Sequence, residues 1–294
     1  MGQEPEHCVC EISEKGGGMT FEEFAAGYGL IIERVEYGAW RRVKTTDHPH
    51  KMNGAYLHRG DVAWVQNHAT MGEPDRWVAD RNSCSRTDQA AIDRRCKEAA
   101  RELQQARQRA ANKAGWIMRQ CSLDKHAYLD SKGFPDALGN VWHRDDEQPL
   151  LCIPMLVAGA IVGVQLISVD GEKKFLAGQR CMGAEYVIDN KGRDWFCEGY
   201  ATGLSLREAL SALKIRYRIH ICFSAHNMSH LAAQCSGSIV VADNDASGTG
   251  EKAARNSGRP WVMSPVAGED ANDWHRRLGA FRFSQEIRAA IAGK

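Results

Sequence analysis

Residues 240–248 read Val240-Val241-Ala242-Asp243-Asn244-Asp245-Ala246-Ser247-Gly248, and this stretch decides the fold class. A run of small apolar residues ends in two acids at alternate positions, and a glycine follows them. Two further acidic clusters also follow apolar runs, Glu198-Gly199 upstream and Gly268-Glu269-Asp270-Ala271-Asn272-Asp273 downstream. Three acidic clusters at strand ends are what a divalent-metal phosphoryl-transfer site requires.

The segment around these clusters alternates between strand and helix patterns. We expect strands at 194–197, 218–223, 238–242 and 260–263, and helices at 201–213, 226–234 and 248–256. Strands that alternate with helices form a parallel sheet with right-handed crossovers. Ligands of such sheets bind outside the carboxyl ends of the strands, which is where Glu198, Asp243 and Asp245 fall.

The N-terminal part of the chain has a different composition. Residues 1–20 are polar and glycine-rich and predict a flexible tail. Residues 21–85 are rich in Trp, Tyr, Val, Gly and His and predict a small β-rich module. Within this module we expect strands at 40–44 and 62–66 and turns at 53–54 and 59–61.

Three more segments complete the predicted organisation. Residues 86–120 are rich in Ala, Arg, Gln and Glu, which predicts a long exposed linking helix with a narrow apolar stripe. Residues 121–193 predict a small α+β subdomain that contains strands at 151–156 and 160–167 and a tight hairpin at Asp170-Gly171. The α/β domain then covers 194–275, and residues 276–294 predict a C-terminal amphipathic helix.

Composition limits the broad class of the protein. The chain has 294 residues, 43% of them hydrophobic and 26% charged, which is ordinary for a soluble globular protein. The formal net charge is +1, so any nucleic-acid-binding surface must come from local segregation of charge. We expect a cytoplasmic location, because the N-terminus lacks a signal-peptide pattern and no apolar run approaches the roughly 20 residues of a membrane span. The ten cysteines show no CxxC spacing and are expected to be reduced thiols.

The acidic residues fit the chemistry of hard cations. Magnesium prefers oxygen ligands and usually takes one or two carboxylates plus waters and substrate phosphates. Two ions roughly 4 Å apart can activate a 3′-hydroxyl and stabilise a leaving pyrophosphate. Glu198 is then either a metal ligand or the general base. The structural alternative for a single Asp-x-Asp at a strand end is a helix N-cap or a surface turn.

This set of motifs resembles the TOPRIM domain of bacterial-type primases, topoisomerases and some nucleases. Glu198-Gly199 is similar to the first motif of that domain, Asp243-Asn244-Asp245-Ala246-Ser247-Gly248 to its DxDxxG motif, and Asp270-Ala271-Asn272-Asp273 to its trailing acidic motif. The resemblance implies that Glu198 is the catalytic acid/base, that Glu198, Asp243 and Asp245 are metal ligands, and that Asp270 and Asp273 are further metal-ligand candidates. It also implies two or more Mg²⁺ or Mn²⁺ ions.

The flanking sequence is similar to that of DnaG-type primases, especially those of phages and mobile plasmids. The resemblance covers about residues 120–275, with Ile153-Pro154-Met155, Gly163-Val164-Gln165 and Cys197–Ser205 as its specific parts. Thr202 stands where many bacterial replicative primases carry another acid, which predicts a weaker metal position. The zinc ribbon usual in these primases needs paired Cys/His ligands, but residues 40–80 contain no cysteine. We therefore expect a ribbon-like N-terminal module without zinc, although its histidines leave a zinc site as the alternative.

Basic and aromatic residues supply candidate nucleic-acid contacts. The basic group nearest the acids in sequence, expected to bind template or NTP phosphates, is Lys173, Lys174, Arg180 and Arg193. The structural alternative is that these are solvated side chains on a hairpin. Trp40, Trp64 and Trp77 with nearby basic residues form either a stacking surface for single-stranded DNA or the core of the β-rich module.

The resemblance thus implies a DNA-directed RNA primase that copies single-stranded DNA into short RNA primers from NTPs, in phage or plasmid replication. No GxxxxGK[ST] phosphate loop is present, so a replicative helicase is expected on a separate chain. Two alternatives remain, a TOPRIM-type metal-dependent nuclease and a non-catalytic DNA-binding replication accessory protein.

Overall fold

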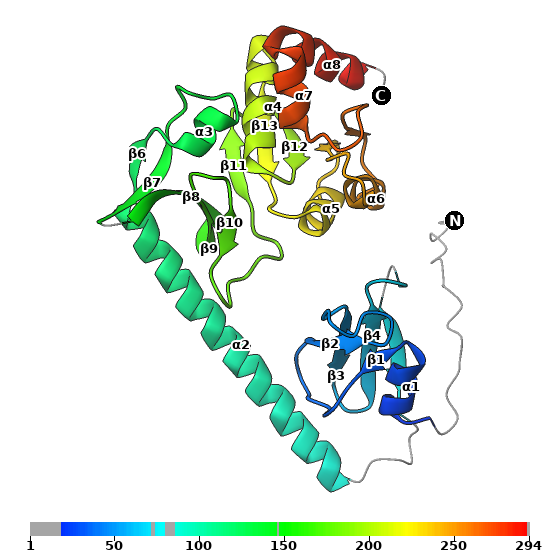
Figure 1. Cartoon of the computed structure of the whole chain (residues 1–294). Helices are drawn as coiled ribbons and strands as arrows, with labels where there is room; N and C mark the ends of the chain where they lie inside the picture. Colours follow the sequence, from blue (N-terminus) through cyan, green and yellow to red (C-terminus); the bar gives the residue numbers. More distant parts are fainter. Residues whose placement is uncertain (1–18, 72–73, 80–85, 146, 293–294) are drawn as a thin grey trace, which may run out of the picture. The chain divides into compact units, whose positions relative to one another are not determined.

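The computed structural model describes residues 19–71, 74–79, 86–145 and 147–292. The predicted flexible tail at 1–20 lies almost wholly outside these residues. The chain forms two compact units, residues 1–105 and 106–294, and the boundary falls inside the helix α2 (Arg86–Gln120). This helix confirms the prediction of a long helix over 86–120. Figure 1 shows its course.

The first unit contains an antiparallel sheet in the spatial order β1-β2-β3-β4-β5, preceded by a short helix. Its elements are α1 (Phe21–Gly27), β1 (Leu30–Ile31), β2 (Arg41–Thr45), β3 (Gly54–His58), β4 (Val62–Asn67) and β5 (Asp75–Val78). The predicted strands at 40–44 and 62–66 are confirmed as β2 and β4. The turn predicted at 53–54 is wrong in part, because Gly54 already pairs with Val43 and Asn67 in the sheet. A Cβ on Gly54 would lie 2.9 Å from Val43 Cγ2, so packing requires the glycine.

The second unit begins with the last part of α2 and another antiparallel sheet, ordered β10-β9-β8-β7-β6. Its elements are β6 (Ser122–Asp124), α3 (Ala127–Ser131), β7 (Gly139–Arg144), β8 (Glu147–Val157), β9 (Ala160–Ile167) and β10 (Lys173–Phe175). The predicted hairpins are confirmed: β8 and β9 turn at Gly159, and Gly171 at φ +86° turns the chain into β10. Ala114 and Ile117 of α2 are fully buried against Cys152 and Val164 of this sheet.

The third sheet has the order β11-β13-β12-β14-β15, and all its neighbouring strands are parallel except β11. Its strands are β11 (Tyr186–Asp189), β12 (Arg193–Cys197), β13 (Tyr217–Ile221), β14 (Ile239–Val241) and β15 (Trp261–Val262). Its helices are α4 (Tyr200–Ala212), α5 (Ala225–Ala233), α6 (Thr249–Asn256), α7 (Ala271–Leu278) and α8 (Ala280–Ala292). The predicted strand–helix alternation and parallel sheet are confirmed. The single helix expected over 276–294 is instead α7 and α8, because Gly279 at φ +77° ends α7.

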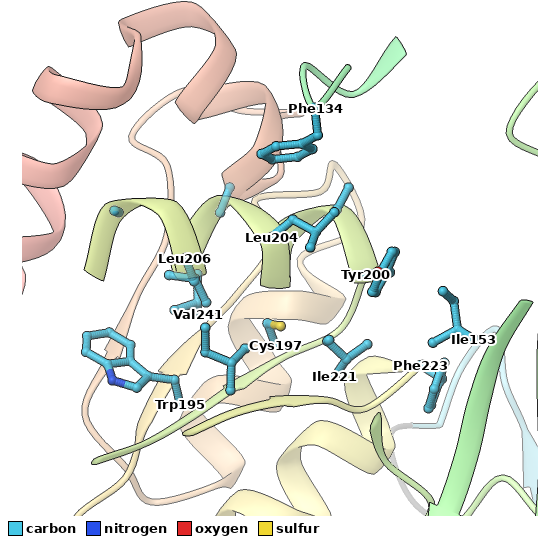
Figure 2. Packing of buried hydrophobic residues seen from close by; sticks show 14 of the residues in the cluster. Phe134, Ile153, Trp195, Cys197, Tyr200, Leu204, Leu206, Ile221, Phe223 and Val241 are labelled. Carbon is cyan, nitrogen blue, oxygen red and sulfur yellow. The ribbon is translucent and has the colours of Figure 1, made fainter. Parts of the chain in front are cut away.

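The two faces of the third sheet bury different sides of β12. Trp195 and Cys197 point into the core shared with α4, where Figure 2 shows them near Leu204 and Leu206. Phe196 points to the opposite face, into the core formed with α5 and α6. Helices α4, α7 and α8 pack on one another, and α5 packs on α6 (Figure 1). A sheet covered on both faces leaves its carboxyl edge as the accessible place for a ligand.

Among the described residues, no helix is both long enough and apolar enough to span a bilayer.

Candidate functional site

The order of strands brings the first two acidic clusters together. The chain leaves β12, forms β13 on one side of it and then β14 on the other, so the connections diverge between β12 and β14. Cys197 is level with Val241 in this parallel pair. Glu198 directly follows β12 and Asp243 follows β14 by two residues, so both carboxylates lie at the same sheet edge. We call the set Glu198, Asp243, Asp245 and Asp270 the acidic edge.

Asp243 is the most perturbed carboxylate of the acidic edge. Burial, together with the negative charges of Glu198 and Asp270, raises its pKa to about 7, and the positive charge of Lys173 opposes this rise. Among the described residues, no group hydrogen-bonds its buried Oδ1 atom. A buried carboxylate oxygen without a donor is unfavourable unless a cation or another donor joins it.

Glu198 is held against the start of α5. Burial raises the pKa of Glu198, the charge of Lys173 lowers it, and the backbone N–H of Ala225 donates to its carboxylate. The backbone around it is also constrained. Phe223, a non-glycine residue with φ +66°, donates its N–H to the Glu198 carbonyl at 2.9 Å. Such strained residues gather at functional sites.

Asp245 has a structural task that matches the alternative reading of the sequence. Its carboxylate accepts hydrogen bonds from the Ser247 side chain and from the backbone N–H groups of Ser247 and Gly250, the latter at 2.9 Å. These bonds lower the pKa of Asp245 to about 2, so it is ionised at neutral pH and holds the turn that leads into α6. Its charge also raises the pKa of both Glu198 and Asp243. Asp245 therefore stabilises the turn before α6 and contributes negative charge to the acidic edge.

Asn244 ties the third acidic cluster to the second. Its backbone N–H donates to the Glu269 carbonyl at 3.0 Å, and its carbonyl accepts from Gly268 N at 2.6 Å. Its side chain donates to the Ser264 carbonyl at 3.0 Å. These bonds hold Asp270 close enough to raise the pKa of Asp243. Sequence analysis missed Asn244, because nothing in an Asp-Asn-Asp spacing indicates a tether to a loop that lies more than 20 residues downstream.

Asp270 and Asp273 occupy different positions. Asp270 is the N-cap of α7, and its Oδ1 accepts from the backbone N–H of Asp273 at 2.8 Å. Asp273 lies in the first turn of α7 and is not among the charges with the largest effect on Glu198 or Asp243. The structure thus brings Asp270 into the electrostatic field of the acidic edge.

The acidic edge is compatible with a hard cation but is not a complete cage. Among the described residues, no three His, Cys, Asp or Glu side chains are grouped closely enough to hold a metal ion. Magnesium needs only one or two carboxylates when waters and substrate phosphates complete its shell. The unpaired Oδ1 of Asp243 and the nearby Glu198 fit that type of site.

Of the four predicted basic contacts, Lys173 reaches the acidic edge. Its charge lowers the pKa of Glu198 and opposes the rise at Asp243. Lys174 points to the other side of β10 and pairs with Glu172 at 3.0 Å. Arg180 donates to the Met182 carbonyl at 2.9 Å. Arg193 starts β12 and donates to the Gly237 carbonyl at 2.6 Å, so it lies at the opposite end of the sheet from Glu198.

The histidines and tryptophans of the first unit separate into core and surface. His58 is buried, its ring packs against Phe21, Tyr37 and Trp77, and burial lowers its pKa to about 4. His48, His50 and His68 are exposed. The Trp77 ring belongs to the same core as His58, and its indole N–H donates to the Met19 carbonyl at 3.1 Å.

Trp40 is the exposed tryptophan in this group. It is 47% exposed and lines a groove of about 530 Å³. The groove is also lined by four basic residues, Arg34, Arg41, Arg42 and Lys44, and by two acidic ones, Glu33 and Glu36. Glu36 pairs with Arg41 at 2.8 Å.

No protein-family model matches the chain. Its structure is similar to a chain of the bacteriophage T7 lagging-strand DNA polymerase complex with the primase domains of two gp4 subunits bound to an RNA/DNA hybrid and dTTP. That match has 15% identity and a TM-score of 0.40, and it covers 58% of this chain and 91% of the other. The match to the primase fragment of the bacteriophage T7 primase-helicase has 18% identity and a TM-score of 0.37, and it covers 54% of this chain and 68% of the other. The match to the Escherichia coli primase catalytic core has 15% identity and a TM-score of 0.31, and it covers 63% of this chain and 74% of the other. The solved structures to which the chain is distantly similar therefore include primase domains.

Proposed function

We propose that the protein is a DNA-directed RNA primase that joins NTPs on a single-stranded DNA template. The observation that carries the proposal is the acidic edge, where Glu198, Asp243 and Asp270 interact electrostatically at the carboxyl end of a parallel sheet. Phosphoryl transfer needs positioning and charge stabilisation more than covalent help from the protein. The motifs at these positions resemble TOPRIM domains, and we assign the third sheet with its helices to that fold.

The acidic residues divide the work according to their surroundings. Asp243 and Asp245 are proposed to hold Mg²⁺ or Mn²⁺, with Asp270 beside them. Among the described residues no donor reaches Asp243 Oδ1, and the low pKa of Asp245 keeps it ionised at neutral pH. When bound, two or more such ions would stabilise the charge of the triphosphate and the departing pyrophosphate. Glu198, whose raised pKa makes it a better proton acceptor than an ordinary carboxylate, is proposed to help deprotonate the attacking 3′-hydroxyl. Lys173 is proposed to bind phosphate oxygens of the incoming NTP.

The first unit is proposed to contact the template. Trp40 offers an exposed aromatic face beside Arg41 and Arg42 in the same groove. Aromatic stacking combined with nearby positive charge is a common way to bind single strands without sequence preference. We place the activity in phage or plasmid replication in the cytoplasm of a bacterial host, with no zinc in the first unit.

The experiment is primer synthesis by the full chain. Purified protein is incubated with single-stranded DNA, labelled NTPs and Mg²⁺ or Mn²⁺. The wild type is expected to make short labelled RNA, and Asp243→Ala none. Lys173→Ala is expected to raise the KM for NTP at least tenfold. Its matched control is Lys174→Ala, which removes the same charge from the neighbouring position that faces away, and its KM should stay within twofold of wild type.

The same samples decide between the activity classes. Metal-dependent degradation of the DNA without RNA synthesis would show that the protein is a TOPRIM-type nuclease and not a primase. Binding of the DNA with neither activity would indicate the replication accessory protein. Equal RNA synthesis by wild type and Asp243→Ala would place the chemistry elsewhere in the molecule.

A further inference from the structure

The hydroxyl of Tyr128 is a buried polar group without an evident structural task. Tyr128 is the second residue of α3 and is 2% exposed. In the part of the chain that the structure describes, its Oη has no hydrogen-bond partner. An unpaired buried hydroxyl destabilises a folded protein relative to a phenylalanine of the same shape, so its presence calls for an explanation.

Helix α3, which carries Tyr128, contacts two segments whose charges act on Asp243. Its ring lies beside the β9–β10 hairpin, where a Cβ on Gly171 would be 3.5 Å from its Cδ2 atom. That hairpin leads directly into Lys173. At the other end of α3, the Lys132 carbonyl accepts a hydrogen bond from Asn272 Nδ2 at 3.0 Å, and Asn272 lies in the first turn of α7. Tyr128 thus lies between the strand that carries Lys173 and the helix that Asp270 caps.

The electrostatics of Tyr128 agree with this placement. Burial raises its pKa to about 12, and the negative charge of Asp270 contributes to the rise. The hydroxyl therefore keeps its proton at neutral pH and can donate one hydrogen bond. Another buried tyrosine shows the usual arrangement: Tyr217 is 7% exposed, and its hydroxyl lies 3.2 Å from the Ser211 hydroxyl.

We propose that Tyr128 is a positioning residue of the acidic edge, whose hydroxyl donates to an oxygen ligand of the divalent cation held beside Asp270. The acceptor is a water or phosphate oxygen, because a cation held by one or two carboxylates completes its coordination shell with such oxygens. The inference rests on the proposed function only through that cation. It gives the hydroxyl of Tyr128 a role that a phenylalanine of the same shape could not fill.

The test is Tyr128→Phe in the full chain, with two readouts that do not require catalysis. Thermal unfolding is measured in EDTA, and the Kd for Mn²⁺ is measured by electron paramagnetic resonance. The melting temperature in EDTA should stay the same or rise by about 2–4 °C, because an unpaired polar group is lost. The Kd for Mn²⁺ should weaken about three- to tenfold, as is typical when a group that supports a ligand is removed.

Tyr217→Phe is the matched control. It removes a paired hydroxyl distant from the acidic edge, so its melting temperature should fall while its Kd for Mn²⁺ stays at the wild-type value. If Tyr128→Phe binds Mn²⁺ as tightly as wild type, the inference is wrong while the proposed metal site stands. If the wild type itself binds no Mn²⁺, the metal site of the proposed function fails as well.

Discussion

Asp243→Asn should make the protein more stable in the absence of metal, and the gain should depend on pH. In the folded chain, burial raises the pKa of Asp243 from 3.8 to about 7. A carboxyl group with a raised folded pKa contributes stability that is fully present below pH 3.8 and is lost as the pH rises through 7. Asparagine keeps the shape without the titration, so the variant has no corresponding loss.

The size of the effect follows from the shift. A difference of about 3 pKa units corresponds to roughly 4 kcal/mol as an upper limit, and solvent at the partly exposed carboxylate reduces this to roughly 2–3 kcal/mol. The gap between variant and wild type should open from about pH 4 and level off above pH 7. For a unit of this size, it corresponds to roughly 4–12 °C in melting temperature at pH 8.

Differential scanning calorimetry from pH 5 to 8.5 in EDTA measures this gap. Asp245→Asn is the control, with the same chemical change two residues away. Hydrogen bonds lower the pKa of Asp245 to about 2, so its stabilising contribution is present above pH 3.8 and is lost as the pH falls toward 2. Asp245→Asn should therefore destabilise the protein at neutral pH, because a neutral amide oxygen accepts the hydrogen bonds of Ser247 and Gly250 more weakly than the ionised carboxylate does.

Addition of Mn²⁺ should reverse the order for Asp243. A ligand that binds only the folded state stabilises it in proportion to the logarithm of its concentration. Wild type should gain melting temperature with Mn²⁺, and Asp243→Asn should not. A variant less stable than wild type at pH 8 in EDTA, or a gap that does not change with pH, would refute the reasoning that Asp243 is a strained buried carboxylate.

Three further outcomes can be measured with single variants. His220 lies 2.7 Å from Glu185 and 3.0 Å from Asp194, and although burial opposes it, these hydrogen bonds raise its pKa. Its stabilising contribution is therefore full below pH 6.5 and is lost as the pH rises through the folded pKa. Denaturant titrations from pH 5 to 9 should show that the free energy of unfolding declines near neutrality in wild type but not in His220→Gln. The same pH dependence in the variant would contradict this. Gly250→Ala should abolish Mn²⁺ binding in calorimetric titrations, because a Cβ there would lie 2.2 Å from the Asp243 carbonyl oxygen. The control is Gly199→Ala, which should bind Mn²⁺ normally, because the nearest atom to its added Cβ is Thr202 Oγ1 at 3.8 Å. Equal affinities of the two variants for Mn²⁺ would contradict the prediction. Trp40→Ala should weaken binding of an oligothymidylate, measured by fluorescence anisotropy, by about 1–3 kcal/mol with an unchanged melting temperature, and undiminished binding would remove the first unit from the template path.

The sequence predicted the third sheet well because its signals are local. Apolar runs that end in acids mark β12 and β14, and the helices between the strands carry regular patterns, with a cap such as Ser224 before α5. The parallel arrangement follows from this alternation. The same reasoning placed Glu198 and Asp243 at a common edge, because the carboxyl ends of parallel strands meet there.

The remaining features depend on contacts between distant residues. Asn244 ties the loop that contains Asp243 to residues 268–269, and Lys173 comes close enough to act on the pKa of Asp243. The hydroxyl of Tyr128 is buried by a segment that is also distant in sequence. No spacing rule connects these segments. Arg193 was grouped with Lys173 because it lies near Glu198 in sequence, but a five-residue strand separates the two ends of the sheet. A strand rises about 3.3 Å per residue, so residues close in sequence can lie at opposite edges.

The central claim is that a divalent cation joins the carboxylates of the acidic edge. A crystal of the full chain soaked in Mn²⁺ and an NTP, measured near the manganese absorption edge, tests this claim directly. The account predicts an anomalous peak within coordination distance of Asp243 Oδ1, the oxygen that has no partner among the described residues. An ordered NTP without a peak at Asp243, or a peak only at carboxylates outside the acidic edge, would contradict it.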